Sequence, residues 1–487
     1  MLLAKLIENI NPLEVHGSPM VEVLSLELNS KIVTSGQLFF ALRGEKSDGH
    51  NYIEDAINKG AIAIVCEKLP EKINSDVCYI VVVDSHKALG IMASVFYGNP
   101  SQKLKLVGIT GTNGKTTTVT LLYRLFRLLG NKVGLLSTVT NFIDDEEISA
   151  THTTPDAITI NKLLATMVKK GCAYCFMEVS SHAIIQKRIE GLEFAGAIFS
   201  NITHDHLDYH KTFAEYLRAK KMFFDNLSST AFALTNIDDK NGKIIVQNTR
   251  AKVKTYALKT MADYNCRVIE SSFEGMQLVV SGLDVWTRFI GTFNAYNLLA
   301  VYATADLLGV EKDEALRLLS AMEAVAGRFE YVRGKNNIVA IVDYAHTPDA
   351  LENVLNTIND IRKNGEQLIT VVGCGGNRDA TKRPEMARIA VENSDRVILT
   401  SDNPRDEEPA AILEDMKAGL DSAQRSKTLF IIDRHEAIRT AAMLAQSGTI
   451  ILVAGKGHET YQEIRGEKKH FDDKEILMQE LNELKMN

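Results

Sequence analysis

Residues 107–118, Val-Gly-Ile-Thr-Gly-Thr-Asn-Gly-Lys-Thr-Thr-Thr, have the pattern of a short apolar strand that runs into a glycine-rich turn and then a helix. Gly111 and Gly114 let the turn curl so that consecutive N–H groups point inward, toward an anion. Lys115 adds an ammonium group, and Thr116 offers a hydroxyl to Mg²⁺. The segment therefore predicts a turn that binds the phosphates of an ATP-type nucleotide.

The turn departs from the strict phosphate-loop pattern, which has a glycine five residues before Gly114. Ile109 stands at that place, and Gly108 lies one residue too far away. An ordinary glycine-rich connection between a strand and a helix is the alternative. Gly-Lys-Thr-Thr at the strand-to-helix junction favours phosphate binding.

The length and composition indicate a multidomain globular protein. At 487 residues the chain is too long for one hydrophobic core, and about three domains are expected. Apolar residues make up 45% of the chain, yet no stretch approaches the ~18 uninterrupted apolar residues of a membrane helix. The first residues carry Glu8 inside what would have to be an apolar segment and lack a small-residue cleavage site, so no secretion signal is expected. We expect a cytoplasmic protein.

Charge and cysteine content exclude further classes. The net charge of −7 and the lack of a Lys/Arg run argue against a nucleic-acid binder. Six scattered cysteines do not form a disulfide framework and are expected to be reduced. Cys172 and Cys175 form a lone CxxC in a segment that resembles a loop entering a buried strand, which disfavours a zinc or redox site.

Breakers divide the chain into three predicted domains, residues 1–99, 100–329 and 330–487. Apolar strands separated by helices imply parallel sheets with helices on both faces. We expect an α/β fold with a smaller N-terminal α/β domain, a central phosphate-loop ATPase domain with a parallel sheet, and a doubly wound C-terminal α/β domain. The expected strands are residues 37–42, 61–66, 79–83, 106–110, 132–136, 173–179, 197–201, 339–342, 368–372, 396–400, 429–432 and 449–453, and helices are expected at 116–129 and 295–308.

Two further segments carry polar side chains after apolar strands. Glu178 lies at the carboxyl end of its strand, where parallel sheets bind ligands, and is a candidate Mg²⁺ ligand. Residues 201–210 pack three histidines and two aspartates into ten positions. A solvated polar loop is the alternative, but the position beside the phosphate loop favours a metal or catalytic role.

Together these segments resemble the Mur ligase family, the ATP-dependent enzymes that add amino acids to the cell-wall precursor. The resemblance implies an N-terminal domain for the UDP end of the substrate, a central ATPase domain and a C-terminal domain that brings the amino acid. It covers essentially the whole chain and rests on Gly111-Thr-Asn-Gly-Lys-Thr-Thr117, Glu178-Val-Ser-Ser-His182, Asp205-His-Leu-Asp-Tyr-His210, Asn294-Ala-Tyr-Asn297, Gly327-Arg-Phe-Glu330, Asp343-Tyr-Ala-His346, Gly373-Cys-Gly-Gly-Asn-Arg-Asp379 and Gly455-Lys-Gly-His-Glu459.

The resemblance also implies a nucleotide site. Lys115 would hold the β and γ phosphates, Asn297 would lie at the adenine, and Arg328 and Asp343 would reach the nucleotide from the domain boundary. The implied ATP-binding residues are Gly111, Thr112, Asn113, Gly114, Lys115, Thr116, Thr117, Asn297, Arg328 and Asp343.

Metal and catalytic roles follow from the same resemblance. Thr116 and Glu178 would hold one Mg²⁺ and His206 a second. Lys220, in Tyr216-Leu-Arg-Ala-Lys220, matches a lysine that family members carboxylate with CO₂, and the carbamate would bridge or orient the Mg²⁺ ions. The implied catalytic groups are Lys115, Lys220 and His206. The alternative for Lys220 and its neighbour Lys221 is a pair of solvated helix lysines.

Within the family, the details resemble the members that act on UDP-N-acetylmuramoyl-L-alanyl-D-glutamate. Residues 29–31, 36–44 and 48–50 are similar to their uridine-binding domain. His152 stands where these members often carry Asn. Hydroxyls and a guanidinium suit the carboxylates of the muramoyl dipeptide, and the matching positions are Ser30, Thr153, Thr154, Ser180, Gln186 and Arg188.

Residues 402–405, Asp-Asn-Pro-Arg, match the tetrapeptide of members that add meso-2,6-diaminopimelate. This amino acid is lysine with an extra terminal carboxylate, which the Arg405 guanidinium can pair bidentately. An exposed turn arginine is the alternative for Arg405. The implied diaminopimelate-binding residues are Arg378, Asp402, Asn403, Pro404, Arg405, Gly455 and Glu459.

The implied reaction uses ATP to convert the γ-carboxylate of the D-glutamyl residue into an acyl phosphate, which the amine of diaminopimelate then attacks. The rival enzymes are an L-lysine-adding ligase and a folate polyglutamate synthetase, and residues 402–405 argue against both. Outside catalysis, the rival is a nucleotide-dependent switch. We expect a monomer that binds these substrates with Mg²⁺ and neither nucleic acid nor a membrane.

Overall fold

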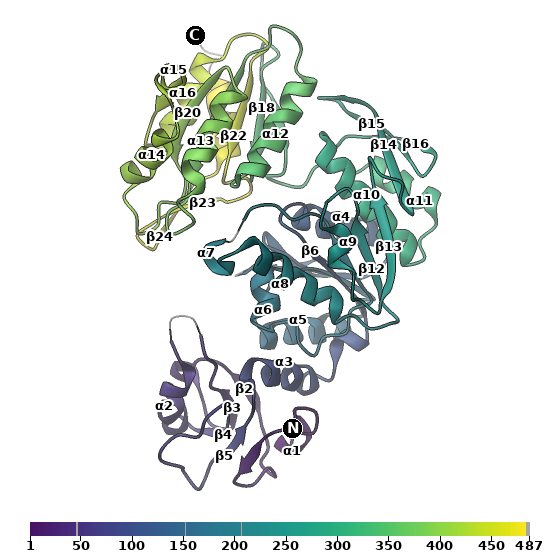
Figure 1. The fold of residues 1–487 in the computed structure, drawn as a ribbon, viewed down its shortest axis with the longest axis vertical. Coiled ribbons are helices and arrows are strands. Elements are labelled where there is room, and N and C mark those ends of the chain that lie inside the picture. The colour runs from purple at the N-terminus through teal and green to yellow at the C-terminus, as the bar shows by residue number, and fades with distance from the viewer. Residues whose placement is uncertain (45–46, 151, 206, 484–487) are drawn as a thin grey trace.

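The computed structural model describes residues 1–44, 47–150, 152–205 and 207–483. Three sheets follow one another along the chain, and each lies in its own domain (Figure 1). The N-terminal domain lies at the bottom of this view, the central domain in the middle and the C-terminal domain at the top. The expected α/β class with three sheet-bearing domains is confirmed.

The N-terminal domain has a five-stranded sheet in the order β1-β5-β4-β3-β2, parallel except for β1. The sequence of β4, Ala-Ile-Ala-Ile-Val-Cys, is almost fully buried, as expected for a strand covered on both faces. Helix α3 packs on the helix α5 of the central domain. The elements are β1 (Glu14–His16), β2 (Ser25–Glu27), β3 (Gln37–Phe40), β4 (Ala61–Cys66), β5 (Cys78–Val81), α1 (Leu3–Ile7), α2 (Ile53–Asn58), α3 (Ser85–Phe96) and the 3₁₀ helices Ser30–Ile32, Gly49–Tyr52 and Pro100–Gln102.

The central domain has an eleven-stranded sheet, β16-β15-β14-β13-β12-β11-β6-β10-β7-β8-β9. The strands from β14 to β7 are parallel, with β6 in the middle. The strands are β6 (Lys105–Thr110), β7 (Val133–Leu136), β8 (Thr140–Ile143), β9 (Glu146–Ser149), β10 (Tyr174–Glu178), β11 (Gly196–Phe199), β12 (Phe232–Asn236), β13 (Lys252–Ala257), β14 (Tyr264–Ser272), β15 (Gly275–Val280) and β16 (Leu283–Thr287).

Helices cover both faces of the central sheet. On one face α4 and α10 share a hydrophobic core, and on the other face α5 and α8 share a second one. Asp156 caps α5 and Thr212 caps α8, each accepting a hydrogen bond from a backbone N–H three residues on. The helices are α4 (Lys115–Leu128), α5 (Ala157–Lys169), α6 (Ser181–Ile185), α7 (Leu207–His210), α8 (Phe213–Asp225), α9 (Gly242–Ile245), α10 (Thr292–Leu307) and α11 (Lys312–Ser320).

The C-terminal domain has a six-stranded sheet, β17-β18-β22-β19-β20-β21, parallel except for β17, with a separate β23–β24 hairpin. Two hydrophobic clusters cover its two faces, as in a doubly wound fold. The elements are β17 (Glu330–Arg333), β18 (Val339–Asp343), β19 (Leu368–Cys374), β20 (Arg396–Ser401), β21 (Thr428–Phe430), β22 (Ile450–Ala454), β23 (Tyr461–Ile464), β24 (Glu467–His470), α12 (Pro348–Ile361), α13 (Lys382–Glu392), α14 (Pro409–Ala418), α15 (Ser422–Ser426), α16 (Arg434–Leu444) and α17 (Asp473–Glu483).

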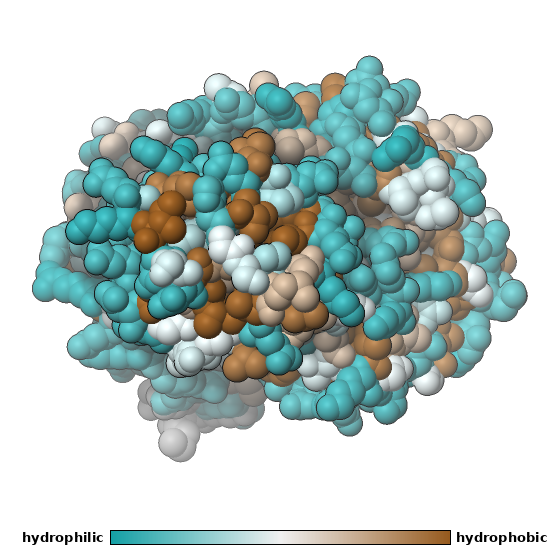
Figure 2. Space-filling view, turned by 90° about the horizontal axis from the view of Figure 1, so that it is seen from below, coloured by the Kyte–Doolittle hydropathy of each residue, from teal (hydrophilic) through white to brown (hydrophobic). Residues whose placement is uncertain are grey.

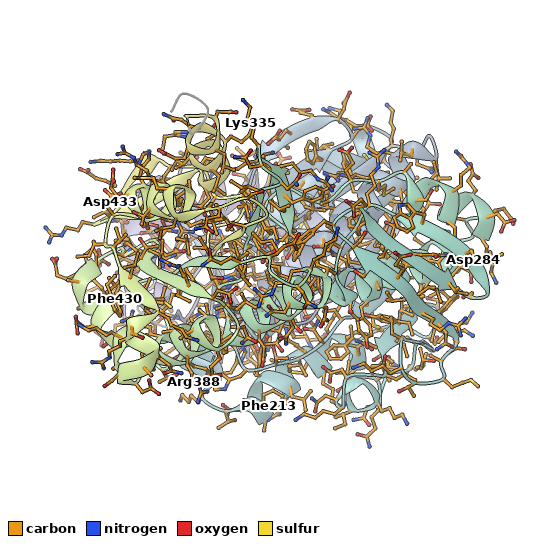
Figure 3. All side chains as sticks on the ribbon, turned by 90° about the horizontal axis from the view of Figure 1, so that it is seen from above. Phe213, Asp284, Lys335, Arg388, Phe430 and Asp433 are labelled. Carbon is orange, nitrogen blue, oxygen red and sulfur yellow. The ribbon has the colours of Figure 1, made fainter. Side chains whose placement is uncertain are left out.

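The edges of the central sheet differ from the expected alternation of strands and helices. Antiparallel hairpins extend the sheet at both ends, β7-β8-β9 on one side and β14-β15-β16 on the other. Their strands are partly exposed and mix polar with apolar residues, so their sequences lack the buried runs that mark the parallel strands. In Figure 3 the outer hairpin, marked by Asp284, lies on the opposite side from Phe430 of the C-terminal domain.

The surface is mostly hydrophilic with scattered apolar groups. Figure 2 shows the end of the molecule that carries the N-terminal domain, where brown groups stand among teal ones. Leu13, Met20 and Leu24 are among the exposed apolar side chains of this domain. Within the described part of the chain, no helix is long and apolar enough to cross a membrane. All six cysteines are buried and free, as expected.

A buried ion pair joins two helices of the C-terminal domain to its sheet. Arg434 donates to both carboxylate oxygens of Asp473, at 2.8 and 2.7 Å, and both side chains are fully buried. The guanidinium also donates to the carbonyl of Ser401, at 3.3 Å, and that of Ala454, at 3.0 Å. These carbonyls lie at the carboxyl ends of β20 and β22, so the pair fixes the edge of the sheet.

We expect Arg434→Met to destabilise the C-terminal domain by about 3 to 5 kcal/mol, because it leaves the Asp473 carboxylate buried without its partner. Arg439→Met is the matched control, since Arg439 is half-exposed on the same helix and its loss should cost under about 1 kcal/mol. Replacing both partners, with Arg434→Met and Asp473→Leu, should recover most of the loss. Urea unfolding followed by circular dichroism measures this, and equal stabilities of the two single variants would contradict the prediction.

Candidate functional site

The phosphate-loop turn connects β6 to α4 at the carboxyl edge of the central sheet. Gly111 packs so closely on β11 that a Cβ there would lie 1.9 Å from the Ser200 hydroxyl oxygen. The backbone N–H of Asn113 donates to the Asn201 side chain at 2.9 Å, and the Ser200 hydroxyl donates to the Asn113 carbonyl at 2.6 Å. The end of β11 therefore holds the turn in place before any ligand binds.

Two lysines meet at one carbonyl oxygen of this turn. Lys115 Nζ and Lys220 Nζ each donate to the Gly111 carbonyl at 2.9 Å. Lys115 Nζ also donates to the Thr112 carbonyl at 2.7 Å, and Lys220 Nζ lies 4.6 Å from the centre of the Tyr216 ring. Lys220 is 1% exposed, whereas the Lys221 side chain is 14% exposed and pairs with Asp225, four residues further along α8, at 2.6 Å. The alternative of two solvated lysines is therefore wrong for Lys220.

Burial disfavours the charged forms of both lysines. Burial holds the pKa of Lys220 well below its ordinary value, the neighbouring Lys115 charge lowers it further, and Asp205 opposes the shift. Burial also lowers the pKa of Lys115, against the attraction of Glu178 and Asp205. The turn thus carries an amine that is easily deprotonated beside a site for anions.

Glu178 ends β10 with a fully buried carboxylate. One oxygen accepts from the Thr138 N–H at 2.8 Å and the other from the Thr138 hydroxyl at 3.1 Å. The Thr138 hydroxyl oxygen also lies 3.0 Å from the Thr153 hydroxyl oxygen, within hydrogen-bond distance. The structure therefore connects Glu178 to the threonine pair that was predicted to bind the muramoyl dipeptide.

Four of the six residues predicted for the dipeptide form one hydrogen-bonded cluster, Thr154, Ser180, Gln186 and Arg188. Arg188 donates to the Thr154 carbonyl at 2.6 Å and, through Nε and Nη2, to Gln186 Oε1 at 3.0 and 2.6 Å. The Ser180 N–H donates to the Thr154 hydroxyl at 3.1 Å. Ser30 is apart from this cluster, in the 3₁₀ helix after β2 of the N-terminal domain, where its carbonyl accepts from Lys59.

Side chains from the C-terminal domain and the domain boundary reach the phosphate-loop turn. Arg328 Nη2 donates to the Thr116 hydroxyl at 3.2 Å, and the Asn113 side chain donates to Asp349, in the first turn of α12, at 2.7 Å. Asn297 on α10 lies against Gly114, where a Cβ would come within 2.5 Å of its amide oxygen. Asp343 ends β18 and accepts from the Phe329 N–H at 2.6 Å. The carboxyl edges of two sheets thus face each other across the turn.

The residues predicted for the amino acid gather at the carboxyl edge of the C-terminal sheet. Asp402 and Asn403 follow β20 and are buried, and Gly455 follows β22. A Cβ on Gly455 would lie 2.6 Å from the Asp402 carboxylate, so only glycine fits there. Asn403 donates to Glu459 Oε2 at 2.7 Å.

Arg405 adopts left-handed backbone geometry, with φ of 52°, and its side chain is 23% exposed. Its Nη1 donates to the Gly376 carbonyl at 2.8 Å and would lie 3.0 Å from a Cβ on Gly375, against which Arg378 also packs. The alternative of an exposed turn arginine is therefore wrong. Both arginines instead lie beside the glycine turn after β19, Arg405 through its guanidinium and Arg378 through its Cγ.

Sequence analysis missed several groups that touch these clusters. Thr138, Asp349 and Arg434 lie in no motif that it singled out, and only the folded chain brings them to the site. Lys456 lies inside one of the motifs but was not assigned a role. Among the residues that the structure describes, no cluster of three or more His, Cys, Asp or Glu could hold a metal ion. The prediction for His206 lies outside the described residues.

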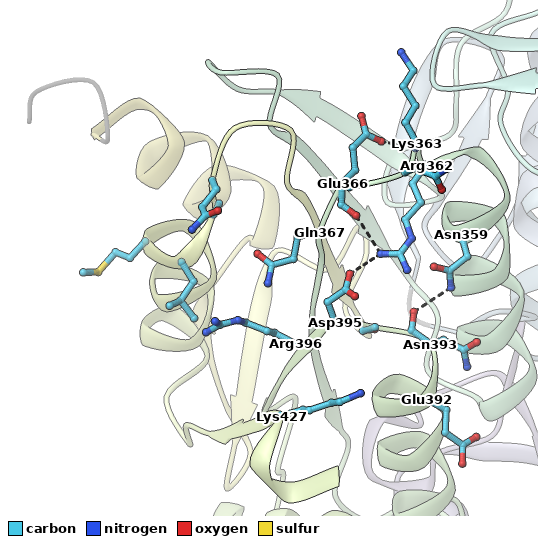
Figure 4. A pocket seen from close by; sticks show the side chains of 17 residues that line it. Asn359, Arg362, Lys363, Glu366, Gln367, Glu392, Asn393, Asp395, Arg396 and Lys427 are labelled. Carbon is cyan, nitrogen blue, oxygen red and sulfur yellow. Dashed lines mark hydrogen bonds and ion pairs between the residues drawn. The ribbon is translucent and has the colours of Figure 1, made fainter. Parts of the chain in front are cut away.

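A depression of about 1220 Å³ lies at the opposite end of the C-terminal sheet (Figure 4). Its lining is polar and self-paired: Arg362 donates to Asp395 at 2.5 Å, and Asn359 donates to the carbonyl of Asn393 at 3.0 Å. Parallel sheets bind ligands at their carboxyl ends. We therefore do not assign the site to this depression, although it is large.

Comparison with known proteins places the chain in a family. The "Mur ligase family, catalytic domain" matches residues 22–97, the "Mur ligase middle domain" matches residues 109–305, and the "Mur ligase, glutamate ligase domain" matches residues 327–457. A curated relative in Cytophaga hutchinsonii is 59% identical over 485 residues, covering 99% of this chain and 100% of the relative. The protein belongs to the Mur ligase family.

Two curated relatives of this Mur ligase carry the same name. The proteins of Cytophaga hutchinsonii and Bacteroides thetaiotaomicron, the latter 57% identical over 99% of this chain and 100% of its own, are both named UDP-N-acetylmuramoyl-L-alanyl-D-glutamate–2,6-diaminopimelate ligase. A solved structure with this name matches the Mur ligase chain with a TM-score of 0.69 at 32% identity, over 99% of both chains. MurF from Acinetobacter baumannii shares the fold, with a TM-score of 0.66 at 18% identity, over 99% of this chain and 98% of its own.

The buried carboxyl group of Asp343 gives this Mur ligase a specific pH dependence. Burial raises its pKa from 3.8 to about 6, and the charge of Arg328 opposes the shift. Below about pH 4 the group is protonated in the folded and unfolded chain alike. Between about pH 4 and 6 the carboxyl group is protonated in the folded chain and ionised in the unfolded chain, so rising pH favours unfolding. The stability that the protonated group contributes is therefore lost as the pH rises through 6.

We expect Asp343→Asn to become more stable relative to the wild type as the pH rises from 4 to 7, by about 3 kcal/mol. Urea unfolding of the ligand-free proteins across this range measures the difference. Asp360→Asn, which alters an exposed carboxylate on α12, is the control and should give a nearly constant difference. A constant difference for Asp343→Asn as well would contradict the raised pKa.

Proposed function

We propose that the chain is an ATP-dependent ligase that adds meso-2,6-diaminopimelate to UDP-N-acetylmuramoyl-L-alanyl-D-glutamate in peptidoglycan precursor synthesis. The observation that carries this proposal is the full-length identity of 56–59% to five relatives named for this reaction. The residues gathered at the two facing sheet edges supply the chemistry that the reaction needs. None of these five relatives is named as an L-lysine-adding ligase or a folate polyglutamate synthetase.

The three domains would divide the work, with boundaries near residues 99 and 329. The N-terminal domain, through Ser30, would hold the UDP end of the acceptor. The central domain would bind ATP and the muramoyl dipeptide, and the C-terminal domain would bring diaminopimelate. Because all these groups come from one chain, we infer that it acts as a monomer. We place the reaction in the cytoplasm, where ATP is available.

The nucleotide phosphates would lie in the turn after β6. Lys115 is already bent over this turn and would exchange its carbonyl partners for phosphate oxygens. Arg328 reaches Thr116 from the domain boundary, and its buried Nε has no hydrogen-bond partner within the described residues, which leaves a donor for an anion. Asp343 and Asn297 would hold the nucleoside, with Asn297 at the adenine.

The oxygen donors around the turn fit Mg²⁺. Thr116 offers a hydroxyl, Glu178 a carboxylate, and a carbamate on Lys220 would add two more oxygens, which matches the preference of Mg²⁺ for hard oxygen ligands. His206 is proposed as a ligand of a second ion. When bound, Mg²⁺ neutralises charge on the phosphates and polarises the transferred phosphoryl group.

The environment of Lys220 supports carboxylation. Carbamate formation needs a neutral amine, whose lone pair forms the C–N bond with CO₂ while a proton leaves the nitrogen. The lowered pKa of Lys220 supplies the neutral form. Conversion of this amine into an anion also removes the repulsion between Lys220 and Lys115 at the Gly111 carbonyl.

Ligation requires a good leaving group, because a free carboxylate would have to expel oxide. The γ-carboxylate of the D-glutamyl residue attacks the γ-phosphorus of ATP, ADP leaves, and an acyl phosphate forms. The amine of diaminopimelate then attacks the acyl carbon, and phosphate leaves as the amide bond forms. Lys115 and Arg328 stabilise the charge on the phosphoryl oxygens. The facing C-terminal domain shields the acyl phosphate from water.

The choice of amino acid would depend on the distal end of diaminopimelate, a carboxylate beside an ammonium. Arg405 Nη1 donates to the Gly376 carbonyl and Nε lies 3.8 Å from Glu463 Oε2, so the remaining N–H groups of Nη1 and Nη2 can bind the carboxylate. Arg378 flanks the same turn. Glu459 is proposed to accept from the ammonium, with Asp402, Asn403, Pro404 and Gly455 shaping the pocket.

We expect Lys220→Ala to lower turnover by about 100- to 1,000-fold, because the carbamate supports the charge of the transferred phosphoryl group. Short carboxylic acids should restore part of the activity, since a free carboxylate can occupy the vacated space. Lys221→Ala is the control and should stay active. ¹³C NMR after exposure to ¹³CO₂ should show a carbamate that Lys220→Ala lacks, and an unmodified Lys220 in fully active enzyme would sink the idea.

We expect Arg405→Lys and Arg405→Asn to raise the KM for diaminopimelate by about 30- to 1,000-fold with little change in the KM for ATP, because a bidentate charge-assisted pair is lost. Asn tolerates the left-handed backbone at this position. Arg388→Ala, on the exposed face of α13, is the control. Wild-type kcat/KM should strongly favour diaminopimelate over lysine, which leaves the guanidinium unpaired. Near-equality of the two amino acids would overturn the assigned selectivity.

A further inference from the structure

Lys456 is a fully buried lysine in the loop after β22 to which no role has yet been assigned. Its Nζ donates to Glu459 Oε2 at 3.0 Å and to Asn403 Oδ1 at 3.1 Å. Asn403 Nδ2 donates to the same Glu459 oxygen at 2.7 Å. The three side chains therefore form a closed triangle of hydrogen bonds at the carboxyl edge of the C-terminal sheet.

The triangle leaves one side of Glu459 open. Both donors converge on Oε2, while Oε1 accepts no hydrogen bond within the described residues, and the side chain is 15% exposed. A carboxylate held through one oxygen has its rotamer fixed and its second oxygen available. This is the arrangement expected of a group that must present one acceptor to a cationic ligand.

Two glycines fix the point from which Lys456 enters the triangle. Gly455 packs on Asp402, and Gly457, with φ of 53°, packs on the far side, where a Cβ would lie 2.7 Å from the Gly327 carbonyl and from Tyr344 Cβ. The loop is therefore held between the residues after β20 and those at the domain boundary. Lys456 cannot move without displacing one of these neighbours.

We propose that Lys456 is a positioning and specificity-determining residue, which orients Glu459 so that Oε1 binds the distal ammonium of the incoming amino acid. The inference deepens the proposed function and rests on its assignment of diaminopimelate to this edge. Lys456 also offsets the negative charge of Glu459. The distal carboxylate of the amino acid then meets the Arg405 guanidinium without repulsion from an uncompensated Glu459 carboxylate.

The test compares two substrates that differ only in the group at issue. 2-Aminopimelate has the reacting amine and the distal carboxylate of diaminopimelate but lacks the distal ammonium. We expect wild-type kcat/KM to favour diaminopimelate over 2-aminopimelate by about 10- to 100-fold, the value of a charge-assisted hydrogen bond. In Lys456→Met this ratio should fall toward one, mainly through KM, with the KM for ATP unchanged.

Further variants distinguish the loss of Glu459 orientation from a general structural effect of the Lys456 substitution. A purely structural loss would lower kcat/KM for both amino acids and leave their ratio intact. Lys468→Met is the control. Lys468 Nζ lies 4.1 Å from the centre of the Tyr461 ring, and Lys456 Nζ lies 5.4 Å from the same centre. Lys468 is therefore a neighbouring lysine that is not part of the triangle. Glu459→Gln should lower the ratio as Lys456→Met does, and the double variant should lower it no further.

The outcomes are distinct. A wild-type-like ratio in Lys456→Met would overturn the inference and leave the ligase assignment intact, whereas a wild type that fails to turn over diaminopimelate would overturn the proposed function as well. If Lys456→Met does not fold, Lys456→Gln takes its place, since an amide keeps a donor without the charge. It should give an intermediate ratio, and an unchanged ratio would again count against the inference.

Discussion

The carbonyl oxygen of Gly111 accepts from Lys115 and from the buried Lys220, and the arrangement of the central domain depends on this convergence. Lys115 comes from the start of α4 and Lys220 from the middle of α8, so the two helices are tied to the end of β6. Burial lowers the pKa of both amines, so their charged forms are disfavoured in the ligand-free chain. The end of β11 holds the turn at which the two amines meet.

The parts that could be predicted from the sequence are those set by local pattern. The parallel strands have the pattern of buried apolar runs. The predicted bounds of β4 match the observed ones, and the predicted ends of most other strands differ from the observed ends by one or two residues. Lys115 follows directly from a strand, a glycine turn and a helix. Lys220 could be assigned only through the family resemblance, because a lysine inside a helix has no local signature of burial.

The parts that could not be predicted depend on residues far apart in the chain. Thr138 reaches Glu178 across 40 positions, and Asp349 reaches Asn113 across 236. Neither contact follows from sequence periodicity. The first depends on the order of strands in the central sheet, and the second on the docking of one domain on another. The edge hairpins were missed for a different reason, because half-exposed strands need no continuous apolar run.

The hydrogen bonds from Asn113 to Asp349 and from Arg328 to Thr116 join the phosphate turn to the C-terminal domain and to the domain boundary. Such a bridge makes binding at the two edges a single equilibrium. If nucleotide favours the bridged form by some factor, it strengthens the binding of the amino acid by a related factor, and the amino acid must strengthen nucleotide binding equally. Cooperativity between the substrates is thus a property of how the domains dock, and a substitution of Asp349, which is assigned to neither ligand, can alter it.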